Sequence, residues 1–264
     1  MGILNSKESL PKTTTTISNT IAEIEKKKAV PSKKEETVSF RCFNTNWSLI
    51  RSLGEGYFGK VYEAKDLTTG SQFAIKIVRF EIANEELARR EVEFSKNIDS
   101  SNVVKIFDSE VMDKDPTTGL PSNGCKFLVI KMELCQGNLN DILIQLISSN
   151  QTLRIDVVFV WFFKMLDVLC DFEQNNLIHR DLKPSNIMIK YEGSSPTEFE
   201  KIQLKIGDFG LAKKMNGNYS NVGTSIFKAL EIIEQEEYDT RADVYSLGMI
   251  LLQVSLLISE GTLA

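Results

Sequence analysis

A glycine-rich stretch near residue 55 has residues suited to holding phosphate. It runs Gly54-Glu55-Gly56-Tyr57-Phe58-Gly59-Lys60-Val61 and separates two segments rich in β-forming residues. Because glycine has no Cβ, backbone N–H groups in such a turn can come close to phosphate oxygens. An ordinary glycine-rich hairpin has the same pattern, so this stretch alone does not decide between the two.

Lys76 lies in the next apolar segment, Phe73-Ala74-Ile75-Lys76. An ammonium group within an apolar strand is costly unless it has an anionic partner. A nucleotide phosphate is one such partner, and the carboxylate of Glu91 in the following segment is another. The alternative is an edge-strand lysine that points to water, which is the common fate of a single lysine.

Two later motifs carry carboxylates and an amide. They are His179-Arg180-Asp181-Leu182-Lys183-Pro184-Ser185-Asn186 and Gly207-Asp208-Phe209-Gly210. Together with the two earlier segments, they resemble in order the GxGxxGxV, VAIK, HRDLxxxN and DFG motifs of the eukaryotic protein kinases. The resemblance extends from Trp47 to about Leu257.

The resemblance implies that ATP and Mg²⁺ are the cofactors. The implied nucleotide-binding residues lie in the glycine-rich turn, on the adjoining strands and in the linker between lobes: Leu53, Gly54, Glu55, Gly56, Tyr57, Phe58, Gly59, Lys60, Val61, Ala74, Lys76, Glu133, Cys135 and Met188. In this family the backbone of Glu133 and Cys135 would bind the adenine edge, and Met132 would limit the back of the pocket.

The resemblance also assigns catalytic roles. Asp181 would orient the substrate hydroxyl and accept its proton, and Lys183 would neutralise charge on the transferred phosphoryl group. Lys76 would hold the α- and β-phosphates, and Glu91 would hold Lys76. The implied metal ligands are Asn186 and Asp208, whose oxygen atoms suit Mg²⁺.

His179 is the only histidine in the chain. A general base is one interpretation of it. In the family that the chain resembles, this histidine packs under the DFG phenylalanine, here Phe209. We therefore expect a structural role.

The type of kinase is indicated by Lys183, which is typical of Ser/Thr kinases at this position, and by Thr224 in Gly223-Thr224. Arg180 before the catalytic aspartate is typical of kinases that are switched by activation-loop phosphorylation. Residues 130–139 resemble the stress-responsive kinases that act on the alpha subunit of the translation initiation factor.

The sequence departs from the family pattern in its second half. Leu230 replaces the proline of Ala-Pro-Glu, and after Glu231 only 33 residues remain (264 − 231). The resemblance therefore implies a C-terminal lobe that stops after the helix bearing Asp243. The alternative to an active kinase is a truncated, non-catalytic module that binds nucleotide or a partner protein.

The elements that position these residues change in type along the chain. Segments 48–53, 59–64, 72–78, 103–111 and 126–132 are predicted strands, and 83–97, 139–147, 155–172 and 242–257 are predicted helices. This order predicts an α+β, two-lobed fold. We expect a disordered tail over residues 1–45 and a kinase domain over 46–264, with an N-lobe at 46–134 and a C-lobe at 135–264.

Composition bears on the expected partners and on the cellular compartment. The formal net charge of −5 gives no electrostatic reason to expect nucleic acid. The four cysteines form no CxxC pair, which favours a reducing compartment over a disulfide framework. We expect a cytoplasmic protein with ATP and a protein substrate as partners.

The N-terminus predicts one modification. Met1-Gly2-Ile3-Leu4-Asn5-Ser6 matches the M-G-x-x-x-[ST] pattern of N-myristoylation, with coincidence as the alternative. One acyl chain binds membranes weakly, so it would make the protein a reversible, peripheral membrane protein at most.

We expect co-expression with N-myristoyltransferase to add the mass of one myristoyl group to the intact protein, and Gly2→Ala to abolish the addition. If mass spectrometry finds no added mass, and Gly2→Ala partitions between membrane and soluble fractions as the wild type does, Gly2 is not acylated.

Overall fold

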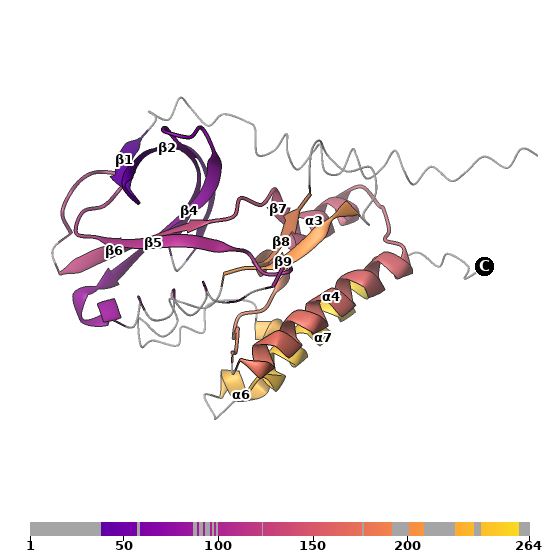
Figure 1. The fold of residues 1–264 in the computed structure, drawn as a ribbon. Helices are drawn as coiled ribbons and strands as arrows, with labels where there is room; N and C mark the ends of the chain where they lie inside the picture. Colours follow the sequence, from indigo (N-terminus) through magenta and orange to yellow (C-terminus); the bar gives the residue numbers. More distant parts are fainter. Residues whose placement is uncertain are drawn as a thin grey trace, which may run out of the picture.

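The computed structural model describes residues 38–56, 59–86, 89, 92, 96, 98, 100–122, 124–175, 177–191, 201–208, 225–234 and 239–258. Within these residues a strand-rich N-lobe precedes a C-lobe that is mainly helical (Figure 1). The predicted α+β, two-lobed architecture is confirmed.

The N-lobe is a six-stranded antiparallel sheet that curls on itself (Figure 1). In spatial order its strands are β1 (Ser39–Cys42), β2 (Thr45–Gly56), β3 (Gly59–Asp66), β4 (Gln72–Glu81), β6 (Cys125–Met132) and β5 (Ile106–Met112). Five of these strands were predicted, namely all except β1.

Strand β1 corrects the predicted tail over residues 1–45, because Ser39–Cys42 pairs with β2 inside the folded lobe. The strand is four residues long and follows a charged stretch, so its period-two pattern was too short to recognise. Its buried end is fixed by Trp47, whose indole N–H donates to the carbonyl of Cys42 at 3.0 Å. Residues 1–37 lie outside the described part of the chain.

Two apolar clusters stabilise the N-lobe. Trp47, Ile75 and Val129 belong to one cluster, which is formed by residues of β1, β2, β3, β4 and β6. Val78 and Ile130 belong to the second cluster, which also includes Val92 of the predicted helix 83–97. That segment begins with the 3₁₀ turn η1 (Ile82–Asn84), and the described residues that follow it as far as residue 96 are helical.

The C-lobe contains the short sheet β7 (Gly137–Asn138), β8 (Ile187–Lys190) and β9 (Gln203–Ile206). Its helical elements are α3 (Leu139–Ser148), α4 (Ile155–Gln174), η2 (Pro184–Asn186), η4 (Ser225–Phe227), α6 (Leu230–Ile233) and α7 (Arg241–Ser255). Helix α3 begins with a capping box in which Asn138 and Asp141 each accept the other's backbone N–H. None of the helices in the described ranges is both long enough and apolar enough to span a membrane.

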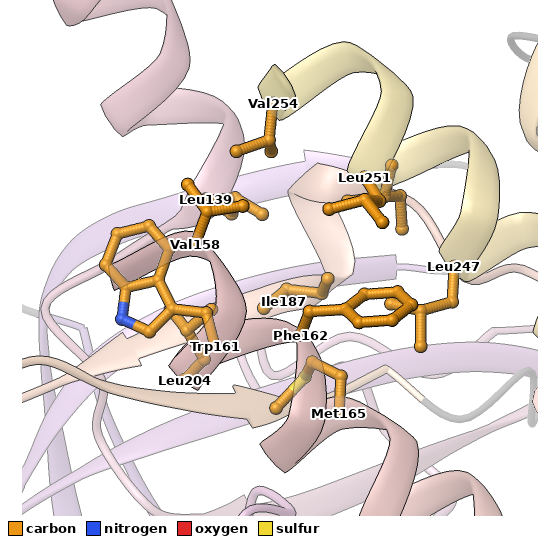
Figure 2. Close-up of a pocket in the computed structure, with 11 residues that line it drawn as sticks. Leu139, Val158, Trp161, Phe162, Met165, Ile187, Leu204, Leu247, Leu251 and Val254 are labelled. Carbon is orange, nitrogen blue, oxygen red and sulfur yellow. The ribbon is translucent and has the colours of Figure 1, made fainter. Parts of the chain in front are cut away.

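Helices α4 and α7 lie side by side (Figure 1), and their facing side chains form the C-lobe core. This core contains an apolar cavity of about 30 Å³. Figure 2 shows Trp161 and Phe162 of α4 and Leu247 and Leu251 of α7 among the side chains that line it. The aromatic cluster at residues 161–163 therefore contributes to packing, although Phe163 itself is exposed.

The two lobes are joined by more than the linker at residues 133–136. Val103 forms a parallel bridge with Ile206 of β9, and Val104 N–H donates to Ile206 O at 2.8 Å. Ile206 N–H in turn donates to Asn102 O at 2.8 Å. The segment before β5 therefore extends the C-lobe sheet and fixes β9 against the N-lobe.

We expect Trp47→Ala to lower the free energy of unfolding by about 3–5 kcal/mol, because it empties a fully buried site and removes the bond to β1. Urea unfolding followed by circular dichroism measures this change. The exposed Leu67→Ala is the control and should change stability by less than about 0.5 kcal/mol. Equal stability of Trp47→Ala and wild type would contradict the placement of β1.

Candidate active site

One face of the N-lobe sheet carries several of the predicted nucleotide-binding residues. In the strand register Val61 lies opposite Lys76, and Ala74 lies opposite Met132. Directly opposite residues share a face, as do residues two apart on one strand, so these four side chains lie on the same face. Lys76 is only 5% exposed, which excludes the alternative of a lysine pointing to water.

The glycine-rich turn joins β2 to β3. Leu53, Gly54, Glu55 and Gly56 end β2, and Gly59, Lys60 and Val61 begin β3. An ion pair of 3.1 Å joins Glu55 to Lys60 across the turn. Tyr57 and Phe58 lie outside the described residues.

Gly59 and Gly54 differ in how much space surrounds them. Gly59 has a φ of +128°, and a Cβ there would overlap the carbonyl of Ile77 on β4, so packing of the sheet requires glycine. A Cβ at Gly54 would meet no atom within 4 Å. Protein packing therefore leaves open space beside Gly54, where a ligand can approach the backbone.

The loop before β8 gathers three predicted residues. Lys183 Nζ lies 3.0 Å from Asp181 Oδ2. The side-chain amide of Asn186 donates to the backbone carbonyl of Asp181 at 2.7 Å and lies 3.3 Å from its Oδ2. These contacts fix the Asp181 carboxylate between a cation and an amide donor.

Asp208 follows β9 and forms an ion pair with Lys76 of β4. The two predicted metal ligands lie on neighbouring segments, because Gly207 N–H donates to the carbonyl of Asn186 at 2.9 Å. Asp208 has a φ of +59°, a left-handed conformation that is uncommon for residues other than glycine. Glu91, the predicted partner of Lys76, lies outside the described residues.

The backbone of this loop is held by Asp243 on α7. Its Oδ2 accepts the N–H of His179 at 2.6 Å, and its Oδ1 accepts the N–H of Arg180 at 2.9 Å. Asp243 is only 1% exposed, so both bonds are made away from water. Arg180 has a φ of +68°, and these bonds stabilise that conformation next to Asp181.

The His179 ring connects the loop to the segment after β9. Asp181 N–H donates to Nδ1 at 3.3 Å, so Nε2 carries the ring proton and donates to Gly207 O at 2.9 Å. With both nitrogens in backbone bonds, the ring is not placed to accept a substrate proton. The geometry supports the predicted structural role, while Phe209 lies outside the described residues.

The linker between the lobes contains Glu133 and Cys135. Glu133 N–H donates to the carbonyl of Lys105 at 2.9 Å, and its carboxylate lies 2.9 Å from Lys205 Nζ. Burial and the nearby Glu133 carboxylate raise the pKa of the Cys135 thiol to about 12. The thiol therefore stays protonated at neutral pH, and a ligand would meet the backbone of Cys135 rather than a thiolate. Met188 lies below the linker on β8.

A family model for the protein kinase domain matches residues 47–259, the region that contains all of these elements except β1 and the first two residues of β2. The chain belongs to the protein kinase family.

Similar curated proteins are Ser/Thr protein kinases. Serine/threonine-protein kinase atg1 of Dictyostelium discoideum is 28% identical over 79% of this chain and 30% of its own length. Serine/threonine-protein kinase Nek5 of Mus musculus is 29% identical over 80% of this chain and 31% of its own. Serine/threonine-protein kinase 33 of Mus musculus is 30% identical over 76% of this chain and 40% of its own. The chain thus spans less than half the length of these relatives. The resemblance of residues 130–139 to the translation-factor kinases stays a prediction.

The donor set of this kinase domain fits the cofactors that the family uses. Asn186 uses its amide nitrogen on Asp181, so its amide oxygen is available as a ligand. Asp208 presents a carboxylate that is about one-third exposed and has one oxygen on Lys76. One amide and one carboxylate oxygen are donors that Mg²⁺ prefers, and Lys76 adds a buried cation for phosphate.

Sequence reasoning missed three residues of the site, namely Asp243, Lys190 and Lys205. Lys205 lies in the apolar strand β9, so the reasoning that identified Lys76 also applies to it. Asp243 had a similar signal, since it is an acidic residue in a predicted apolar helix. Lys190 carries no such signal, because it ends its strand.

We expect Asp243→Ala to lower the free energy of unfolding by at least about 2 kcal/mol, because two buried N–H groups lose their acceptor. Asp243→Asn, which keeps one acceptor oxygen, should lose less. Urea unfolding of both variants measures the difference. Asp113→Ala, which breaks an exposed ion pair with Lys126, is the control and should leave stability close to that of the wild type. A loss no larger than the control would contradict this role of Asp243.

Proposed function

We propose that this protein is an ATP-dependent Ser/Thr protein kinase that transfers the γ-phosphoryl group to hydroxyl groups of proteins. The observation that carries the proposal is the contact of Asp181 with Lys183 and Asn186, next to the Lys76–Asp208 pair. This arrangement combines a carboxylate for the hydroxyl proton with cations and oxygen donors for the phosphates.

The reaction requires one new bond and one broken bond. The substrate hydroxyl oxygen bonds to the γ-phosphorus, the bond to the β–γ bridging oxygen breaks, and ADP leaves with that electron pair. The Asp181 carboxylate accepts the hydroxyl proton, and Lys183 stabilises the negative charge of the transferred group. Lys183 Nζ is 3.0 Å from Asp181, so the cation is already beside the reacting oxygen.

The nucleotide would lie between the lobes. The carbonyl of Glu133 and the N–H of Cys135 would bind adenine, with Val61 and Ala74 above it and Met188 below it. Lys76 would pair with the α- and β-phosphates and still contact Asp208. Mg²⁺ held by Asn186 and Asp208 would neutralise phosphate charge.

Ser and Thr are the proposed acceptor residues, rather than Tyr. Lys183 is two residues after Asp181, as is typical of Ser/Thr kinases, and the similar proteins carry that name. Thr224, the second indicator, lies outside the described residues. The proposal includes a cytoplasmic location, with weak, reversible membrane contact through Gly2, and a protein rather than a nucleic acid as substrate.

We expect Asp181→Asn, Lys76→Met and Asp208→Asn each to reduce phosphotransfer from ATP to a generic protein substrate by about 10²-fold or more. Asp181→Asn should still bind ATP, because Asp181 acts on the hydroxyl. Radiolabelled phosphate transfer and ATP binding by calorimetry give the two measurements. Asp167→Asn, an exposed carboxylate on α4, is the matched control and should retain full activity.

Near-wild-type turnover by any of the three variants would contradict the assigned roles. A wild-type protein that binds ATP but transfers no phosphate would favour the alternative, a non-catalytic module that binds nucleotide.

A further inference from the structure

The carboxylate of Glu133, a linker residue, is the centre of a cluster of charged side chains. Lys205 Nζ lies 2.9 Å from Oε2 and Lys190 Nζ lies 3.7 Å from Oε1. The backbone N–H of Lys105 lies 3.4 Å from Oε2. Two C-lobe cations therefore face one carboxylate of the linker.

The cluster continues along the linker. Lys190 Nζ donates to the carbonyl of Leu134 at 2.8 Å. Gln136 N–H donates to Ile189 O at 2.9 Å, and the Gln136 side chain exchanges two bonds of 3.3 Å with the backbone of Tyr191. The linker is thus fastened to β8 and to the residue after it at successive positions.

Two backbone groups of the linker are left without such a bond. Among the interactions between described residues, none uses the carbonyl of Glu133 or the N–H of Cys135. These are the groups that would bind the adenine edge. Lys205 contacts the side chain of Glu133, and Lys190 contacts the carbonyl of Leu134, the residue between Glu133 and Cys135. The directions of the Glu133 carbonyl and the Cys135 N–H should therefore depend on these two lysines.

The strand register explains why both lysines reach the linker. Lys205 of β9 lies directly opposite Met188 of β8, and Lys190 is two residues after Met188. All three side chains therefore lie on one face of the sheet, the face that would form the floor of the adenine site.

We propose that Lys190 and Lys205 are positioning residues for adenine, acting through Glu133 and Leu134 rather than by touching the nucleotide. Lys205 is buried, so removing its charge leaves the Glu133 carboxylate with a weaker and more exposed partner, and the linker loses one fixed orientation. The proposal rests on the proposed function, because it requires that adenine binds at the linker.

The test is a binding comparison of adenosine and ATP by calorimetry on Lys205→Met, Lys190→Met, Glu133→Gln and the double variant Glu133→Gln/Lys205→Met. We expect each lysine variant to bind both ligands about tenfold more weakly than wild type. The loss should be equal for adenosine and ATP, because the linker meets the base. The double variant should lose less than the sum of its two single losses.

Kinetics give a second readout. The lysine variants should raise KM for ATP and leave kcat within about twofold, because uniform binding is lost and the Asp181 site is intact. Lys126→Met is the matched control, since Lys126 pairs with Glu85 at 2.8 Å away from the linker, and it should bind both ligands as wild type does. If Lys205→Met does not fold, Lys190→Met, whose lysine is more exposed, still decides the outcome.

Wild-type affinity for adenosine in the folded lysine variants would overturn the proposal. A loss confined to ATP would also overturn it, because it would show that the lysines act on the phosphates. A wild-type protein that binds neither ligand would instead overturn the proposed function.

Discussion

The carboxylate of Asp243 is the interaction on which the rest of the site depends. It is buried on α7 and accepts the N–H groups of His179 and Arg180, which fixes the backbone just before Asp181. His179 then donates to Gly207, the residue before Asp208. One buried acid therefore holds the backbone just before Asp181, the proposed catalytic residue, and through the His179 ring it also holds the segment that carries Asp208, a proposed metal ligand. The packing of α7 on α4 determines where Asp243 lies, so the position of the loop that carries Asp181 depends on that packing.

The site also depends on how the lobes are held together. The ion pair of Lys76 and Asp208 joins β4 of the N-lobe to the segment after β9. Val104 and Asn102 bond to Ile206 only two residues before Asp208. A movement of the N-lobe would therefore displace Asp208 by two routes, through β9 and through the ion pair with Lys76. These two connections hold Lys76 and Asp208 in one relative position, as their proposed roles toward phosphate and Mg²⁺ would require.

Sequence alone predicted the two-lobed fold and identified Asp181, Lys183 and Asn186 as site residues, because they belong to one motif; that Asp181 contacts the other two is shown by the structure. It did not predict β1, whose four residues are too few for a periodic signal. It also missed Asp243, since the pairing with His179 spans 64 residues and only the packing of α7 brings them together. The requirement for glycine at position 59 has a similar origin, because the atom that a Cβ would meet belongs to Ile77 of another strand.

Lys76 and Lys205 are both buried lysines that need a carboxylate partner, but their partners differ in exposure. Each is a buried lysine in an apolar strand, and each pairs with a carboxylate from a separate segment, Asp208 for one and Glu133 for the other. A buried ammonium that lost its partner would be strongly destabilising, so each pair holds two segments together. Asp208 is about one-third exposed, whereas Glu133 is about one-sixth exposed. The Lys76–Asp208 pair is therefore the more accessible of the two, and in the proposed function it is the pair that an incoming phosphate would meet.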